Sequence, residues 1–158
     1  MRFALPSSWG RFVPWAWHPA LRRYLAVTAL GHLAWEGAQM PLYTLWRTGT
    51  PGQVAWAVVH CMAGDVLIAA AALAGSLLLF GSADWPQSGF RQVTASTVTL
   101  GLAAAVVIER LAIAWGAWSY SGAMPVLPGL SVGLAPVAQW VVIPCLALRS
   151  VQAIRSRT

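Results

Sequence analysis

The stretch "VAWAVVHCMAGDVLIAAAALAGSLLLF", residues 54–80, decides the fold class. A helix needs about 20 mostly apolar residues to cross the hydrocarbon core of a bilayer, and this stretch exceeds that length. It stops at "GSADWPQSG", a run of turn-forming residues. The stretch therefore predicts a membrane-spanning helix followed by a short connection.

The composition of the whole chain leads to the same class. Of 158 residues, 58% are hydrophobic and 9% are charged, against roughly 45–50% and about 25% in soluble domains. So few polar side chains cannot cover a water-facing surface, which predicts an integral membrane protein surrounded by membrane lipids. The net charge is +6, but the arginines are spread along the chain rather than clustered. We therefore expect no nucleic-acid partner.

Three further segments are long and apolar enough to be spans. The four predicted spans cover about 24–45, 54–80, 91–118 and 130–148. Pro41 should bend or end the first span, and Pro136 and Pro144 should interrupt the fourth. The predicted fold is all-α: a polytopic membrane protein with one domain, a four-helix transmembrane bundle over 24–148.

Arginines mark the two sides of this bundle unequally. The side of both termini holds Arg2, Arg11, Arg22, Arg23, Arg91, Arg149, Arg155 and Arg157, and the other side holds Arg47 alone. Basic residues are enriched in cytoplasmic segments, so both termini are predicted to be cytoplasmic. We expect a multi-pass protein of a bacterial inner membrane.

The two ends of the chain have compositions of their own. Residues 1–23 mix tryptophans and arginines with three prolines that break up any apolar run. This predicts a segment at the membrane–water interface rather than a cleavable signal. Residues 149–158 should form a basic cytoplasmic tail.

Three of the four acidic residues, Glu36, Asp65 and Glu109, fall inside predicted spans. An ionised carboxylate at the bilayer centre costs roughly 2.5–3.5 kcal/mol, so these side chains should face inward and find partners or protons. At about 1.5 Å per residue, Glu36 and Asp65 lie near mid-bilayer and Glu109 lies nearer the outer face. We predict a shared site with these three carboxyls as its catalytic groups.

Other polar residues lie at similar depth. His32, Glu36 and Gln39 share one helical face, because they are four and seven residues apart. The predicted ligand-binding residues are His32, His60, Gln139, Tyr120 and Trp140.

Purely structural explanations stay open for each polar group. His32 and Glu36 are spaced to pair within one helix, and Glu109 or Arg110 could pair with neighbouring helices. Asp65 could bond backbone or threonine groups, and Gln139 could be interhelical glue.

A metal site is a further alternative, since His32 and Glu36 have the one-turn spacing of paired ligands and His60 and Asp65 could complete the shell. However, the chain has neither H-E-x-x-H nor a repeated E-x-x-H. We predict no metal and no other cofactor.

Proton chemistry on an apolar molecule fits these residue types better. Burial favours a protonated carboxyl that can donate, while a second carboxylate in a more polar setting accepts. The leading hypothesis is binding or proton-assisted conversion of an isoprenoid- or lipid-like molecule. The alternative is a non-enzymatic membrane subunit or assembly factor, whose buried polar residues specify pairing with a membrane protein or a second copy. The sequence leaves open which of the two applies.

The stretch "ERLAIAWGAWSYSGAMPVLPGLSVGLAPVAQW", residues 109–140, resembles part of the carotenoid-biosynthesis membrane proteins of the bisanhydrobacterioruberin-hydratase type. Glu109 followed by Gly116, Trp118 and Tyr120, and then Pro136 before Trp140, carry the resemblance. It implies isoprenoid chemistry with Glu109 and Tyr120 as functional positions. The whole chain also resembles small bacterial four-span membrane proteins of unknown function.

Overall fold

The computed structural model describes residues 17–155. The elements are α1 (His18–Gln39), the 3-10 turn η3 (Met40–Leu42), α2 (Leu45–Thr48), α3 (Pro51–Phe80), α4 (Phe90–Ala114), β1 (Val126–Leu127), β2 (Val132–Gly133) and α5 (Leu134–Arg155). The architecture is therefore helical, as predicted, with one two-stranded hairpin. The predicted interfacial segment 1–23 lies mostly outside the described residues, and its last six residues begin α1.

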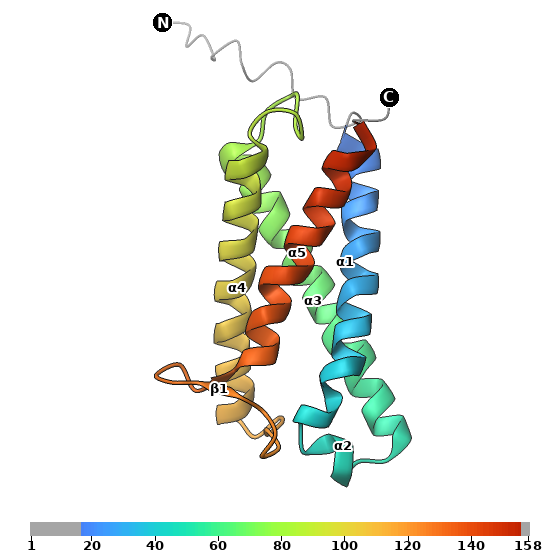
Figure 1. Cartoon of the computed structure of the whole chain (residues 1–158), viewed down its shortest axis with the longest axis vertical. Coiled ribbons are helices and arrows are strands. Elements are labelled where there is room, and N and C mark those ends of the chain that lie inside the picture. Colours follow the sequence, from blue (N-terminus) through green and yellow to red (C-terminus); the bar gives the residue numbers. More distant parts are fainter. Residues whose placement is uncertain (1–16, 156–158) are drawn as a thin grey trace, which may run out of the picture.

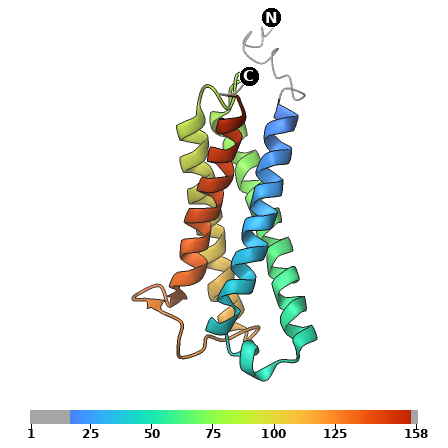
Figure 2. The same cartoon turned by 45° about the vertical axis from the view of Figure 1, so that its right-hand side comes forward.

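The four long helices pack around a common axis. Helix α1 contacts α3 and α5, and α4 contacts the same two helices from the opposite side. One end of the bundle, here the termini end, holds the start of α1, the end of α5 and the α3–α4 connection (Figure 1). The other end, here the hairpin end, holds α2 and the β1–β2 hairpin, as both views show (Figure 2).

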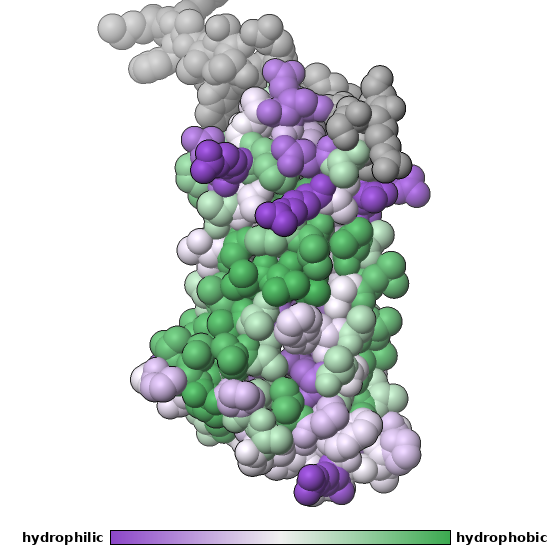
Figure 3. Space-filling model, viewed as in Figure 1, coloured by the Kyte–Doolittle hydropathy of each residue, from purple (hydrophilic) through white to green (hydrophobic). Residues whose placement is uncertain are grey.

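Three helices within residues 17–155 are long and apolar enough to cross a membrane: Pro51–Phe80, Phe90–Ala114 and Leu134–Ala153. Several leucines on these helices are exposed, among them Leu67 at 72% and Leu78 at 81%. On the face shown in Figure 3, apolar residues form a broad band between more polar ends. A water-soluble monomer rarely shows so large an apolar patch. The chain is a membrane protein by this criterion.

Local signals explain where α3 and α4 begin and end. Helix α3 starts with a capping box: the Thr50 hydroxyl accepts from the Gln53 backbone N–H at 3.3 Å, and the Gln53 side chain accepts from the Thr50 N–H at 2.8 Å. Helix α4 ends at Ala114 rather than at the predicted 118. Gly116 takes the left-handed conformation with φ 70°, which closes the helix.

The other two helices differ more from the predicted spans. Helix α1 begins at His18 and ends at Gln39, because Pro41 forces the chain into the 3-10 turn. Pro136 lies in the first turn of α5, where proline is tolerated. Pro144 does not interrupt α5, which continues to Arg155 through what was predicted to be a separate tail. Prolines inside helices of membrane proteins are accommodated in this way.

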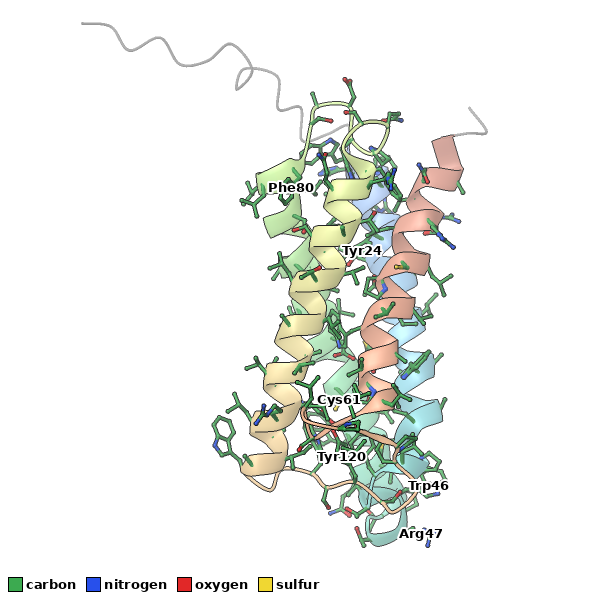
Figure 4. The ribbon with its side chains drawn as sticks, turned by 60° about the vertical axis from the view of Figure 1, so that its left-hand side comes forward. Tyr24, Trp46, Arg47, Cys61, Phe80 and Tyr120 are labelled. Carbon is green, nitrogen blue, oxygen red and sulfur yellow. The ribbon has the colours of Figure 1, made fainter. Side chains whose placement is uncertain are left out.

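Packing differs between the two halves of the bundle. Near the termini end, a core of apolar side chains fills the interior, including Tyr24, Leu73, Trp85 and Leu148. Tyr24 and Phe80 lie in this half, whereas Cys61 and Tyr120 lie toward the hairpin end (Figure 4). The carboxyl and imidazole groups of the interior lie in the middle of the bundle and toward the hairpin end, whereas the buried hydroxyls of Ser76 and Thr97 lie toward the termini end.

Helices α4 and α5 approach closely where Gly101 faces Trp140. A Cβ atom at position 101 would lie 2.5 Å from Cζ3 of the Trp140 ring, closer than two carbon atoms can approach. Trp140 is 3% exposed, so its ring has little room to move aside. The absence of a side chain at Gly101 therefore sets the position of this tryptophan.

We predict that Gly101→Ala lowers the free energy of unfolding by about 1–3 kcal/mol through overpacking, although alanine is the better helix former. The measurement is equilibrium unfolding of the purified protein in detergent. Gly75→Ala on α3 is the matched control, because its Cβ would meet only Leu100 at 3.8 Å, an ordinary contact. Equal stability of the two variants would contradict the steric argument.

Candidate functional site

Helix α1 turns its polar face into the bundle. Its buried residues are Tyr24, Thr28, His32, Glu36 and Gln39, which follow one another at intervals of three or four residues. Leu30, on the opposite face, is 68% exposed. This arrangement is the reverse of a soluble amphipathic helix, and it delivers the histidine and the glutamate to the interior.

The side-chain amide of Gln139 on α5 joins three helices. Its Nε2 lies 2.9 Å from Glu36 Oε1 on α1 and 3.1 Å from Asp65 Oδ2 on α3, and donates to both. Gln39 donates to the same Glu36 oxygen at 2.9 Å and to Gln139 Oε1 at 3.3 Å. Gln139 is 1% exposed, so protein groups alone satisfy its amide.

His32 completes this group, here called the amide cluster (His32, Glu36, Gln39, Asp65 and Gln139). His32 Nδ1 lies 3.0 Å from Asp65 Oδ2 and 2.8 Å from Gln139 Nε2. A proton must lie between His32 and Asp65, on the nitrogen or on the oxygen, for that contact to be a hydrogen bond. The amide cluster therefore brings an imidazole, two carboxyls and two amides together within a network of hydrogen-bond distances.

Glu109 on α4 has a separate set of partners. Tyr43 donates to Glu109 Oε1 at 3.0 Å, and Tyr120 donates to the same oxygen at 2.7 Å. The two phenol rings lie 5.5 Å apart between centroids. This group, here called the tyrosine cluster (Tyr43, Glu109 and Tyr120), holds a carboxyl with two hydroxyl donors.

The chain at the hairpin end positions the tyrosine cluster. Tyr43 and Tyr120 form a β-bridge, and Ser121 N donates to Leu42 O at 2.8 Å beside it. The backbone N–H of Gly133, in the hairpin, donates to the Tyr120 hydroxyl at 2.7 Å. Burial raises the pKa of Tyr120, which keeps its hydroxyl protonated and able to donate.

One cavity of about 540 Å³ connects the two clusters. Glu36, Asp65 and Glu109 all line it, each from a different helix. The other lining residues are Gln39, Met40, Tyr43, Leu45, Gln53, Trp56, Ala57, His60, Cys61, Gly64, Ile68, Ala105, Ile108, Ala117, Trp118, Pro136, Gln139 and Trp140. Most of these walls are apolar or aromatic, and the polar groups converge from the few positions described above.

The remaining predicted site residues, Trp140, His60 and Tyr120, lie in or next to the cavity wall. Trp140 lines the cavity, and its ring centroid is 5.1 Å from that of His32. His60 lines the cavity on an exposed part of α3, where it stacks on Trp56 with centroids 5.7 Å apart. Tyr120 is not a lining residue, but its hydroxyl donates to Glu109, which lines the cavity.

The observed partners of the polar side chains differ from the purely structural pairings that the sequence left open. His32 Nδ1 lies against Asp65 Oδ2 of α3, while Glu36 accepts from Gln139 of α5. Glu109 is bonded by tyrosines, and the neighbouring Arg110 is exposed. Asp65 is bonded by side chains of α1 and α5 rather than by threonines of α4.

Two residues of the clusters are not among the predicted site residues. The sequence pattern puts Gln39 on the polar face of α1 but assigns it no role, and it does not indicate Tyr43. Tyr43 lies four residues after Gln39 and seven after Glu36, the same spacing that groups the α1 residues. Extending that spacing past Pro41 would have included it.

The residues that the structure describes contain no group of three or more His, Cys, Asp or Glu side chains suited to a metal ion. Comparison of the chain with protein-family models, with curated proteins and with solved structures finds no match.

We predict that Gln139→Leu lowers the free energy of unfolding by about 1–2 kcal/mol, because it removes the donor shared by Glu36 and Asp65. The measurement is equilibrium unfolding in detergent. Gln92→Leu on α4 makes the same chemical change at an exposed position, and we expect no loss there. If both variants unfold alike, the amide cluster does not hold the helices together.

Proposed function

We propose that this chain is a four-span membrane protein whose cavity binds an apolar, isoprenoid- or lipid-like molecule and converts it by proton transfer. The observation that carries the proposal is that carboxyls from three helices line one cavity with largely apolar walls. The volume of about 540 Å³ falls in the range of roughly 300–1,000 Å³ typical of ligand pockets.

The position of α1 supports its role as the fourth span. Its 22 residues extend about 33 Å, enough for a hydrocarbon core of about 30 Å. Its polar residues lower its average hydropathy, yet they face the interior and leave apolar residues on the outside. We infer that α1 crosses the bilayer with its neighbours.

The arginines support an orientation with cytoplasmic termini in a bacterial inner membrane. Arg22, Arg23, Arg91 and Arg149 belong to the termini end, whereas Arg47 and Arg110, which lies one turn before the end of α4, belong to the hairpin end. The positive-inside rule then assigns the termini end to the cytoplasm. The cavity would belong to the outer half of the bilayer.

The proposed chemistry begins with proton transfer to a double bond. A protonated carboxyl gives its proton to one carbon of a C=C bond, and the π electrons form the new C–H bond. The neighbouring carbon becomes a cation that carboxylate charge stabilises. A second carboxylate then removes a proton from a carbon next to the cation, and the electrons of that C–H bond form a shifted double bond. Alternatively, a water molecule adds to the cation and the second carboxylate removes a proton from that water. In both cases atoms and charge balance once the proton returns to the first carboxyl.

The resemblance of residues 109–140 to carotenoid hydratases favours the addition of water. Glu109 and Tyr120, the positions that the resemblance assigns, are hydrogen-bonded to each other at 2.7 Å. A carboxyl held by a hydroxyl donor beside an apolar cavity is suited to activate water. This supports Glu109 as the base and the amide cluster as the source of the proton.

One observation favours the alternative, a non-enzymatic subunit or assembly factor. The amide cluster ties α1, α3 and α5 together, which is what residues that only specify helix pairing would do. Substitutions that keep these bonds but remove an acidic proton separate the two functions.

We predict that Gly64→Phe abolishes binding of apolar ligands, because Gly64 lines the cavity and a side chain there meets nothing within 4 Å. Gly37→Phe is the matched control: it is equally unobstructed, on the exposed face of α1. Lipids that co-purify with wild type and each variant are identified by mass spectrometry. Loss of the same species from both variants, or from neither, would contradict the assignment of the cavity.

We predict that Glu36→Gln lowers product formation by about 10²-fold or more, the usual contribution of a general acid or base. The glutamine keeps the oxygen that accepts from Gln39 and Gln139. Isoprenoid and lipid extracts are compared between a deletion strain complemented with wild type and one complemented with the variant, with protein level measured by immunoblot. Parallel loss of protein and product would favour the helix-pairing function, and an unchanged product would exclude Glu36 as the acid.

A further inference from the structure

The charged residues that line the cavity are of one sign. Glu36, Asp65 and Glu109 line it, no arginine among residues 17–155 does, and the basic residues of the chain include no lysine. The bonds described above use Glu36 Oε1, Asp65 Oδ2 and Glu109 Oε1. Glu36 and Asp65 also lie within hydrogen-bonding reach of each other, as do Trp118 and Glu109. The cavity therefore gathers carboxyl oxygens from three helices.

Gln39 adds an independent observation. Its side chain is 4% exposed and lines the cavity, and its Nε2 is used by Glu36 and Gln139. Its Oε1 is buried and has no hydrogen-bond partner among the residues described. A buried carbonyl oxygen without a donor costs free energy that a ligand carrying an N–H group would recover.

Aromatic rings complete the surroundings. Tyr43, Trp56, Trp118 and Trp140 line the same cavity. The faces of tryptophan and tyrosine attract cations, most strongly where water is excluded. Carboxyl oxygens and aromatic faces around an apolar space are together suited to an organic cation.

A bare metal ion fits the cavity less well. A metal requires several ligand atoms around one point, and the described residues offer no group of three suitable side chains. The carboxyls instead belong to two clusters at different places on one wide cavity. A ligand that fills this space needs a hydrocarbon body as well as a positive charge.

We propose that the cavity binds lipophilic amines in their protonated form, with the ammonium group donating to carboxyl oxygens that line the cavity and to Gln39 Oε1, and with the hydrocarbon chain against the aromatic and aliphatic walls. The proposal rests on the cavity of the proposed function and names the charge that its ligand carries. The two fit together chemically, because a site that stabilises a carbocation also favours a stable cation of similar shape.

The test compares geranylamine, which is protonated at neutral pH, with geraniol, which has the same carbon skeleton and a neutral hydroxyl. Binding of each is measured by calorimetry to the full chain in phosphatidylcholine nanodiscs, after subtraction of empty nanodiscs. We expect wild type to bind the amine at least tenfold more tightly than the alcohol. Glu36→Gln and Glu109→Gln should each reduce that preference to less than threefold, since both keep the bonded oxygen and remove a carboxyl that can ionise beside a bound ammonium group.

Asp84→Asn is the matched control, because it removes one carboxylate from the exposed α3–α4 connection; its preference should equal that of wild type. If amine and alcohol bind wild type equally well, the charge selectivity is overturned while the proposed apolar ligand stands. If the glutamine variants keep the full preference, the carboxyls are not the binding groups and the inference is overturned. If neither probe binds, the inference and the proposed function both fail.

Discussion

The hydrogen bonds of the Gln139 side chain are the constraint on which the interior of this bundle depends. In a bilayer, a polar group that turns away from its partners meets lipid rather than water. Glu36 and Asp65 therefore have to meet a donor inside the protein, and the Gln139 amide supplies it from a third helix. This requirement fixes the rotation of α1 about its axis: His32 faces inward and Leu30 faces outward. The outward apolar surface of α1 follows from the inward polar one.

The two halves of the bundle serve different purposes because their interiors pack differently. Toward the termini end, the described interior holds apolar side chains together with the hydroxyls of Tyr24, Ser76 and Thr97, and no carboxyl group. Toward the hairpin end, the helices enclose a cavity, and Trp140 lies between the two halves with its ring against Gly101. A packed apolar half therefore adjoins a half that contains a cavity, which is the division that the proposed ligand site needs.

Sequence reasoning succeeded where one helix was enough to decide the outcome. The end of α3 at Phe80 follows from its apolar run, the end of α1 follows from Pro41, and the shared face of His32 and Glu36 follows from their spacing. It failed where a cap, a turn or a tertiary contact decided. The start of α3 at Pro51 depends on its capping box, the end of α4 depends on the left-handed Gly116, and Pro144 is accommodated within α5. The pairing of Tyr43 with Tyr120 joins segments far apart in the chain, so no local spacing could reveal it.

The separation of the carboxyls into two clusters has a chemical consequence. Two hydroxyl donors converge on one oxygen of Glu109, whereas Glu36 and Asp65 share the amide donor of Gln139, and Asp65 lies beside His32. Proteins assign acid and base roles to side chains of the same type by placing them in surroundings that shift their pKa values differently. Both clusters line one cavity, so the proposed function assigns the proton source to the amide cluster and the base to the tyrosine cluster. Three carboxyls in a single cluster would share one environment and offer no such assignment.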